Sequence, residues 1–81
     1  MSERAVQAVL EQILTVAIDG ARDARKRASQ DRFEDGRLMA YYDMITWAQT
    51  QAKLMGVEFS DKSLASFDAD KELLRGKKRA A

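Results

Sequence analysis

The stretch LMAYYDMITWAQTQAKLMG, residues 38–56, decides the fold class of this chain. It contains only two charged side chains, Asp43 and Lys53, in a chain that is 33% charged. Its apolar residues recur every three or four positions, which is the period of a helix face. The predicted core face of this helix consists of Leu38, Tyr41, Ile45, Ala48, Ala52 and Met55. Because so few charges interrupt the stretch, the remaining helix surface also needs a cover.

The two ends of this helix are marked differently in the sequence. Gly56 follows the last periodic residue and Lys53 lies in the last turn, so we expect the helix to stop at a left-handed glycine. At the other end, Asp31 to Glu34 have the spacing of a capping box, whereas Asp35-Gly36 is a typical turn dipeptide. The helix can therefore start near residue 32 or near residue 36, and the sequence leaves both starts open.

The first 28 residues predict a second long helix. Its expected core face comprises Val6, Leu10, Ile13, Ala17, Gly20 and Ala24, with Val9 and Val16 beside it. From Ala17 onward this face carries small residues, which allow another helix to approach closely. We therefore predict an antiparallel helical hairpin with a short turn, in which Ala24 faces Tyr41 or Tyr42.

The composition also predicts an all-α fold. The 81 residues include no Pro and only four Gly, and few alternating runs suggest strands. We expect one helical domain over residues 1–76 and a basic, disordered tail over residues 77–81. We find neither a signal-peptide pattern nor a run of about 18 apolar residues, so we expect no export and no membrane span. The cytoplasm is the expected location.

Either of two parts of the protein can bury the charge-poor surface of the helix at residues 38–56. One is the C-terminal stretch, in which Ser60 or Asp61, and then Asp68, can cap short helical turns that fold back on the hairpin. The other is a second copy of the chain, so that two hairpins form a homodimeric four-helix bundle. The predicted interaction surface comprises side chains of this helix that do not face the first helix. They are Met39, Tyr42, Met44, Trp47 and Leu54.

The sequence lacks the residues that most catalytic and metal sites require. With no His and no Cys, the chain has no disulfide, no thiolate zinc site and no imidazole base. Residues 68–73 begin like a calcium loop, but Leu73 stands where that loop requires Gly. We therefore predict a protein without catalytic activity or cofactor, acting as a homodimeric adaptor or regulator that binds an unidentified protein partner.

Nucleic-acid binding is the alternative interpretation. Residues 22–37 contain six basic and four acidic side chains, which leaves a net charge of +2, and the whole chain carries +1. These values are small for a phosphate-binding surface. The residues that would contact nucleic acid are Arg22, Arg25, Lys26, Arg32, Lys77, Lys78 and Arg79.

Overall fold

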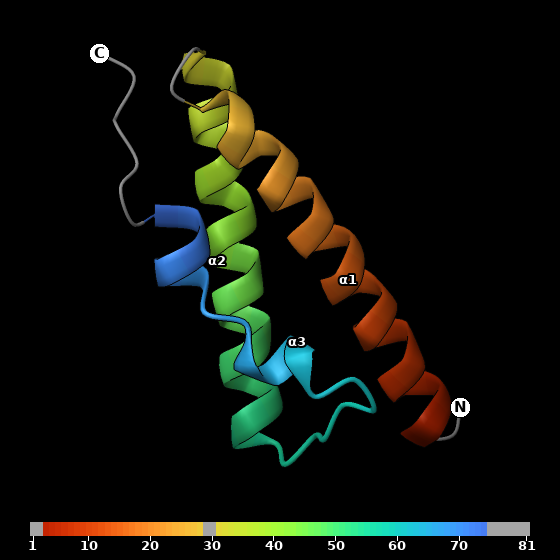
Figure 1. Cartoon of the computed structure of the whole chain (residues 1–81). Coiled ribbons are helices and arrows are strands. Elements are labelled where there is room, and N and C mark those ends of the chain that lie inside the picture. Colours follow the sequence, from red (N-terminus) through yellow and green to blue (C-terminus); the bar gives the residue numbers. More distant parts are fainter. Residues whose placement is uncertain (1–2, 29–30, 75–81) are drawn as a thin grey trace.

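The computed structural model of the chain describes residues 3–28 and 31–74. Its elements are α1 (Glu3–Arg27), α2 (Arg32–Leu54), the short α3 (Ser63–Ser66) and a single π-helical turn, η1 (Asp70–Leu74). No strand occurs in these two ranges, so the all-α prediction is confirmed. The two long helices pack against each other as an antiparallel hairpin, as predicted (Figure 1). The expected tail at residues 77–81 lies outside the described residues.

The structure selects the earlier of the two possible starts for α2. Asp31 is the N-cap, and the Phe33 amide donates a hydrogen bond of 2.9 Å to its Oδ1. Glu34 does not complete a capping box, because its carboxylate accepts a 2.8 Å hydrogen bond from Arg37. Asp35 and Gly36 therefore lie within the first turns of the helix.

The glycine stop at the end of α2 is confirmed. Gly56 has a φ of 70°, the left-handed conformation that a side chain would disfavour. Its amide donates to the Lys53 carbonyl at 3.3 Å, and the Val57 amide donates to the Ala52 carbonyl at 2.8 Å. This pair of hydrogen bonds satisfies carbonyls that the last turn of a helix leaves without partners.

The buried face of α1 differs from the predicted one. Leu14 is the first buried residue of the helix, and Val6, Leu10 and Ile13 are 44%, 37% and 54% exposed. The buried residues of this segment are Leu14, Ala17, Ile18, Ala21, Ala24 and Ala28. The physical reason is that α1 and α2 lie closest near the turn and diverge toward the N-terminal end of α1 (Figure 1). The predicted aliphatic half of the core face is therefore exposed.

Gly20 of α1 packs against the Tyr41 side chain of α2. A Cβ atom built on this residue would lie 2.6 Å from Cζ of the Tyr41 ring, so the ring occupies the space that a side chain would need. The predicted pairing has Tyr41 or Tyr42 against Ala24. The structure instead places Tyr41 about one helical turn nearer the N-terminus of α1.

The C-terminal segment, residues 60–74, folds back on one side of the hairpin, as one of the two predicted possibilities. Its apolar residues Leu64, Ala69 and Leu73 are buried. The N-cap position of α3 is Lys62, one residue after the predicted Asp61, although Asp61 Oδ1 accepts from the Ser63 amide at 2.9 Å. Before η1, Asp68 Oδ1 accepts from the Lys71 amide at 2.9 Å, as predicted.

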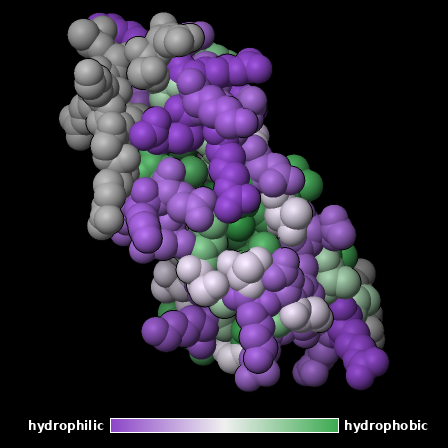
Figure 2. Space-filling view, viewed as in Figure 1, coloured by the Kyte–Doolittle hydropathy of each residue, from purple (hydrophilic) through white to green (hydrophobic). Residues whose placement is uncertain are grey.

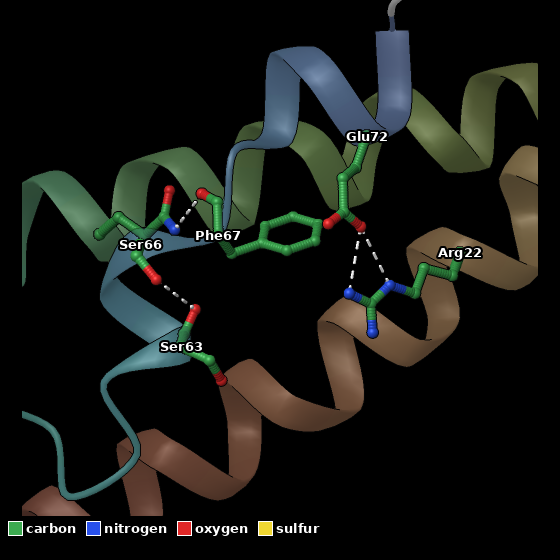
Figure 3. Close-up of polar contacts among 6 residues, drawn as sticks. Arg22, Ser63, Ser66, Phe67 and Glu72 are labelled. Atoms are coloured by element: carbon green, nitrogen blue, oxygen red, sulfur yellow. Dashed lines mark hydrogen bonds and ion pairs between the residues drawn. The ribbon is translucent and has the colours of Figure 1, made fainter.

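Polar contacts fix this segment to both long helices (Figure 3). Gln49 of α2 donates through Nε2 to the carbonyls of Leu64 and Phe67, at 3.0 and 2.9 Å. Arg22 of α1 forms an ion pair of 3.1 Å with Glu72, and its guanidinium lies 5.3 Å from the centre of the Phe67 ring. The segment thus covers the side of α2 that contains Gln49.

Candidate interaction surface

The hairpin carries a second, uncovered apolar surface, which we call the apolar face. It consists of nine side chains, each between 37% and 76% exposed. They are Val6, Val9, Leu10, Ile13 and Val16 of α1, Met44, Trp47 and Leu54 of α2, and Met55, the C-cap residue of α2. Trp47 and Gln49 point about 200° apart around α2, at about 100° per residue, so the C-terminal segment does not cover this face.

Charged side chains are nearly absent around the apolar face. Between Arg4 and Asp19, α1 has a single charged residue, Glu11, and its Oε1 accepts a 3.0 Å hydrogen bond from the Asp61 amide on the covered side. Between Arg37 and Lys53, α2 has only Asp43. Asp43 lies one turn before Trp47 and about 40° from it around the helix, so it borders the face. The rest of the face lacks the charged side chains that usually make a helix surface soluble.

The exposed residues of α1 have the spacing of a helix-packing seam. Val6, Val9, Ile13 and Val16 are separated by three, four and three residues, the pattern of the two core positions in a heptad repeat. All four are β-branched and all four are exposed. The seven-residue spacing of Val6 and Ile13 continues to Gly20, which packs against Tyr41, so the spacing alone does not separate this seam from the buried face beside it.

The exposed side of α2 has a seam of the same period. Ala40, Trp47 and Leu54 are spaced by seven residues, and Met44 and Gln51 follow Ala40 and Trp47 by four. Trp47 is 69% exposed and Leu54 is 74% exposed. Each long helix thus contributes one buried face to the hairpin and presents a second seam to solvent.

A groove of about 390 Å³ lies between the two seams. Leu14, Ala17 and Ala52 contribute to its walls, and Gln51 is its single lining residue with a polar side chain. A hollow of about 320 Å³ shares the lining residues Ile13, Ala17 and Met44 with the groove. The shared residues place the two hollows next to each other along the hairpin, and hollows of this kind accept apolar side chains from another helix.

The end of the hairpin near the turn is charged instead. Asp23 pairs with Arg27 and with Arg37, each at 3.7 Å, and Arg37 also pairs with Glu34 at 2.8 Å. The hydrogen bond that Arg37 donates to Glu34 raises the pKa of Arg37, whose guanidinium lies 5.5 Å from the centre of the Tyr41 ring. Figure 2 shows hydrophilic side chains over this end of the molecule. The ion pairs therefore gather at the turn end, and the nine side chains of the apolar face lie toward the other end of the hairpin.

No family model, curated protein or solved structure matches this chain. Its own surface is therefore the guide to its function. Within residues 3–28 and 31–74, no three His, Cys, Asp or Glu side chains gather in a way that could hold a metal ion. No helix in the described part of the chain has the length and apolar character needed to cross a membrane.

The predicted interaction residues divide between two sides of α2. Met44, Trp47 and Leu54 lie on the apolar face. Met39 is 37% exposed and lies about 80° from Trp47 and about 140° from Met44 around the helix, so it borders the face on the side nearer the turn. Tyr42 is half-buried under the C-terminal segment, where its hydroxyl donates to Asp70. That hydrogen bond, together with burial, raises the pKa of Tyr42.

The structure describes four of the seven basic residues considered for nucleic-acid contacts. Arg22 is paired with Glu72 and stacked over Phe67. Arg25 is half-buried, whereas Lys26 and Arg32 are exposed. The other three predicted contacts, Lys77, Lys78 and Arg79, lie outside the described residues.

Proposed function

We propose that this chain is a non-catalytic interaction protein that works as a homodimer, with the apolar face as its interface. The observation that carries the proposal is the exposure of nine apolar side chains on two adjacent helices, without a charge among them. Leaving such surface in water is unfavourable by about 25 cal/mol per Å², and a partner removes this cost.

The size of the face suits a stable complex. Side chains of these sizes and exposed fractions present roughly 900 Å², compared with about 800 Å² that each partner buries in a standard interface. The largest apolar patch of a typical monomer covers only about 300–600 Å². The apolar face therefore exceeds what a monomeric protein of this size usually exposes.

A second copy of the chain supplies a matching surface. Two hairpins that join through their apolar faces form a four-helix bundle, in which each exposed seam becomes part of the core. The C-terminal segments lie on the outer sides of this bundle, because they cover the opposite side of each hairpin. The dimer then acts as an adaptor or regulator, and its outer surface is available to a further protein partner.

Light scattering on a charge-insertion variant tests the proposal. Wild-type protein should have close to twice the chain mass of 9.1 kDa, and Trp47→Glu should have the mass of one chain. Trp47 is exposed in the hairpin, so the variant should keep its helical circular dichroism. Lys62→Glu, an exposed change outside the apolar face, is the control and should remain dimeric. A wild-type protein that is monomeric at about 200 μM would refute the proposal.

A further inference from the structure

We infer that the second copy docks antiparallel, about a two-fold axis that lies in the interface and runs perpendicular to the helix axes. In this arrangement α1 packs against α1 of the second copy, and α2 packs against α2. The inference rests on the proposed function and adds which side chains meet. Two observations carry it, namely the confinement of the apolar face to one end of the hairpin and the symmetry of the two seams.

The charge distribution disfavours the other two-fold arrangement, with the axis along the bundle. That arrangement would bring the two turn ends together and pack the ion pairs of Asp23, Glu34 and Arg37 against their own copies. Removing such charges from water costs several kcal/mol per ion. An antiparallel arrangement overlaps only the apolar ends and leaves both charged ends in solvent, at opposite ends of the dimer.

The α1 seam has the symmetry that an antiparallel pair requires. About a two-fold axis, residues at equal distances on either side of the axis meet, and each contact occurs twice. Val6 and Val16 each lie five residues from Glu11, and Val9 and Ile13 each lie two residues from it. With the axis at this height, Val6 meets Val16 of the second copy and Val9 meets Ile13.

The α2 seam has nearly the same symmetry about Thr50. Trp47 lies three residues before Thr50 and Leu54 four residues after it. Met44 lies six residues before and Met55 five residues after. An axis at this height therefore pairs Trp47 with Leu54 of the second copy and Met44 with Met55, so that each of these exposed side chains gains an apolar neighbour.

The midpoints of the two seams, Glu11 and Thr50, lie at the same height along the hairpin. Tyr41 packs against Gly20, which fixes how α1 and α2 are aligned. Nine residues from Gly20 toward the N-terminus is Glu11, and nine residues from Tyr41 toward the C-terminus is Thr50. Antiparallel helices rise equally per residue, so Glu11 and Thr50 are level and a single axis satisfies both seams. A stable hairpin does not require the midpoints of its two exposed seams to be level, whereas an antiparallel dimer does.

Cysteine cross-linking of the full chain tests the arrangement, because the natural sequence has no Cys. Val6→Cys and Val16→Cys are prepared separately, mixed in equal amounts and oxidised, and the products are identified by mass spectrometry. We expect a disulfide between residue 6 of one copy and residue 16 of the other. Val6→Cys alone should cross-link at least fivefold less, because its two thiols would be about 15 Å apart.

A mixture of Val6→Cys with Met55→Cys distinguishes the alternative. If the axis lies along the bundle, residue 6 faces α2 of the second copy. The mixture with Met55→Cys then cross-links and the mixture with Val16→Cys does not. That result overturns the inference. Light scattering on the same samples separates the two proposals. A dimer without the disulfide between residues 6 and 16 refutes the arrangement alone, whereas a monomer refutes the proposed function itself.

Discussion

The Tyr41 ring lies against the backbone of Gly20, where a Cβ atom would come within 2.6 Å of the ring. Gly20→Ala should gain about 1 kcal/mol of helix propensity but lose about 1–3 kcal/mol to overpacking. We expect a net loss of about 1 kcal/mol in the free energy of unfolding, measured by urea denaturation.

Two further variants show whether the ring causes this loss. In a Tyr41→Leu background the ring is gone, so Gly20→Ala should become stabilising by about 0.5–1 kcal/mol. Gly36→Ala should be stabilising by a similar amount in the wild type, because nothing lies within 4 Å of a Cβ atom there. The same sign for Gly20→Ala in both backgrounds would contradict the pairing of Tyr41 with Gly20.

The contacts of Gln49 predict how the C-terminal segment is held. Gln49→Glu keeps the shape of the side chain but removes the amide that donates to the Leu64 and Phe67 carbonyls. We expect a loss of about 1–3 kcal/mol and faster amide hydrogen exchange at residues 63–74. Lys62→Ala, an exposed change in the same segment, should stay within about 0.5 kcal/mol of wild type. Unchanged exchange in Gln49→Glu would show that apolar burial alone holds the segment.

The Asp61 carboxylate predicts a dependence on acid pH. The Ser63 hydroxyl and then the Ser63 amide donate to Asp61 and lower its pKa below the usual 3.8. A carboxyl group with a lowered folded-state pKa stabilises the fold above its unfolded pKa, and this contribution is lost as pH falls through the folded pKa. A carboxyl NMR titration should place the Asp61 pKa below 3.8 in wild type and closer to 3.8 in Ser63→Ala. Equal values in the two proteins would remove the hydroxyl as a cause.

The ion pairs around Arg22 and Arg37 predict weak nucleic-acid binding. Both guanidinium groups are already paired with carboxylates, and residues 22–37 carry a net charge of only +2. In fluorescence polarisation at about 50 mM salt, we expect duplex DNA and single-stranded RNA to bind with a Kd above about 100 μM. Binding tighter than about 10 μM with a steep salt dependence, lost on removal of residues 77–81, would favour the nucleic-acid interpretation instead.

The features that the sequence predicts correctly depend on neighbouring residues. The stop at Gly56 and the cap at Asp68 are local, because a glycine or a short carboxylate satisfies backbone groups within a few positions. The buried face of α1 is not local. Ile13 and Leu14 are adjacent, and the sequence alone does not show which of the two stripes faces α2. The divergence of the helices, which is a tertiary property, decides it.

The interaction residues are harder to predict for a related reason. The sequence identifies them only as side chains of α2 that do not face α1, and such side chains lie on both remaining sides of α2. Folding of the C-terminal segment onto one side covers Tyr42 and leaves Trp47 exposed. Only the position of that segment distinguishes the two.

The fluorescence of Trp47, the single tryptophan of the chain, is the most direct probe of the proposed dimer. The side chain is 69% exposed in the hairpin and lies on the apolar face, so a second copy would move it out of water. We expect its emission to shift to shorter wavelength between about 1 and 200 μM, in step with the rise in mass from one chain to two. Emission that stays at the wavelength of a water-exposed indole over that range, with the mass of one chain, would contradict the dimer.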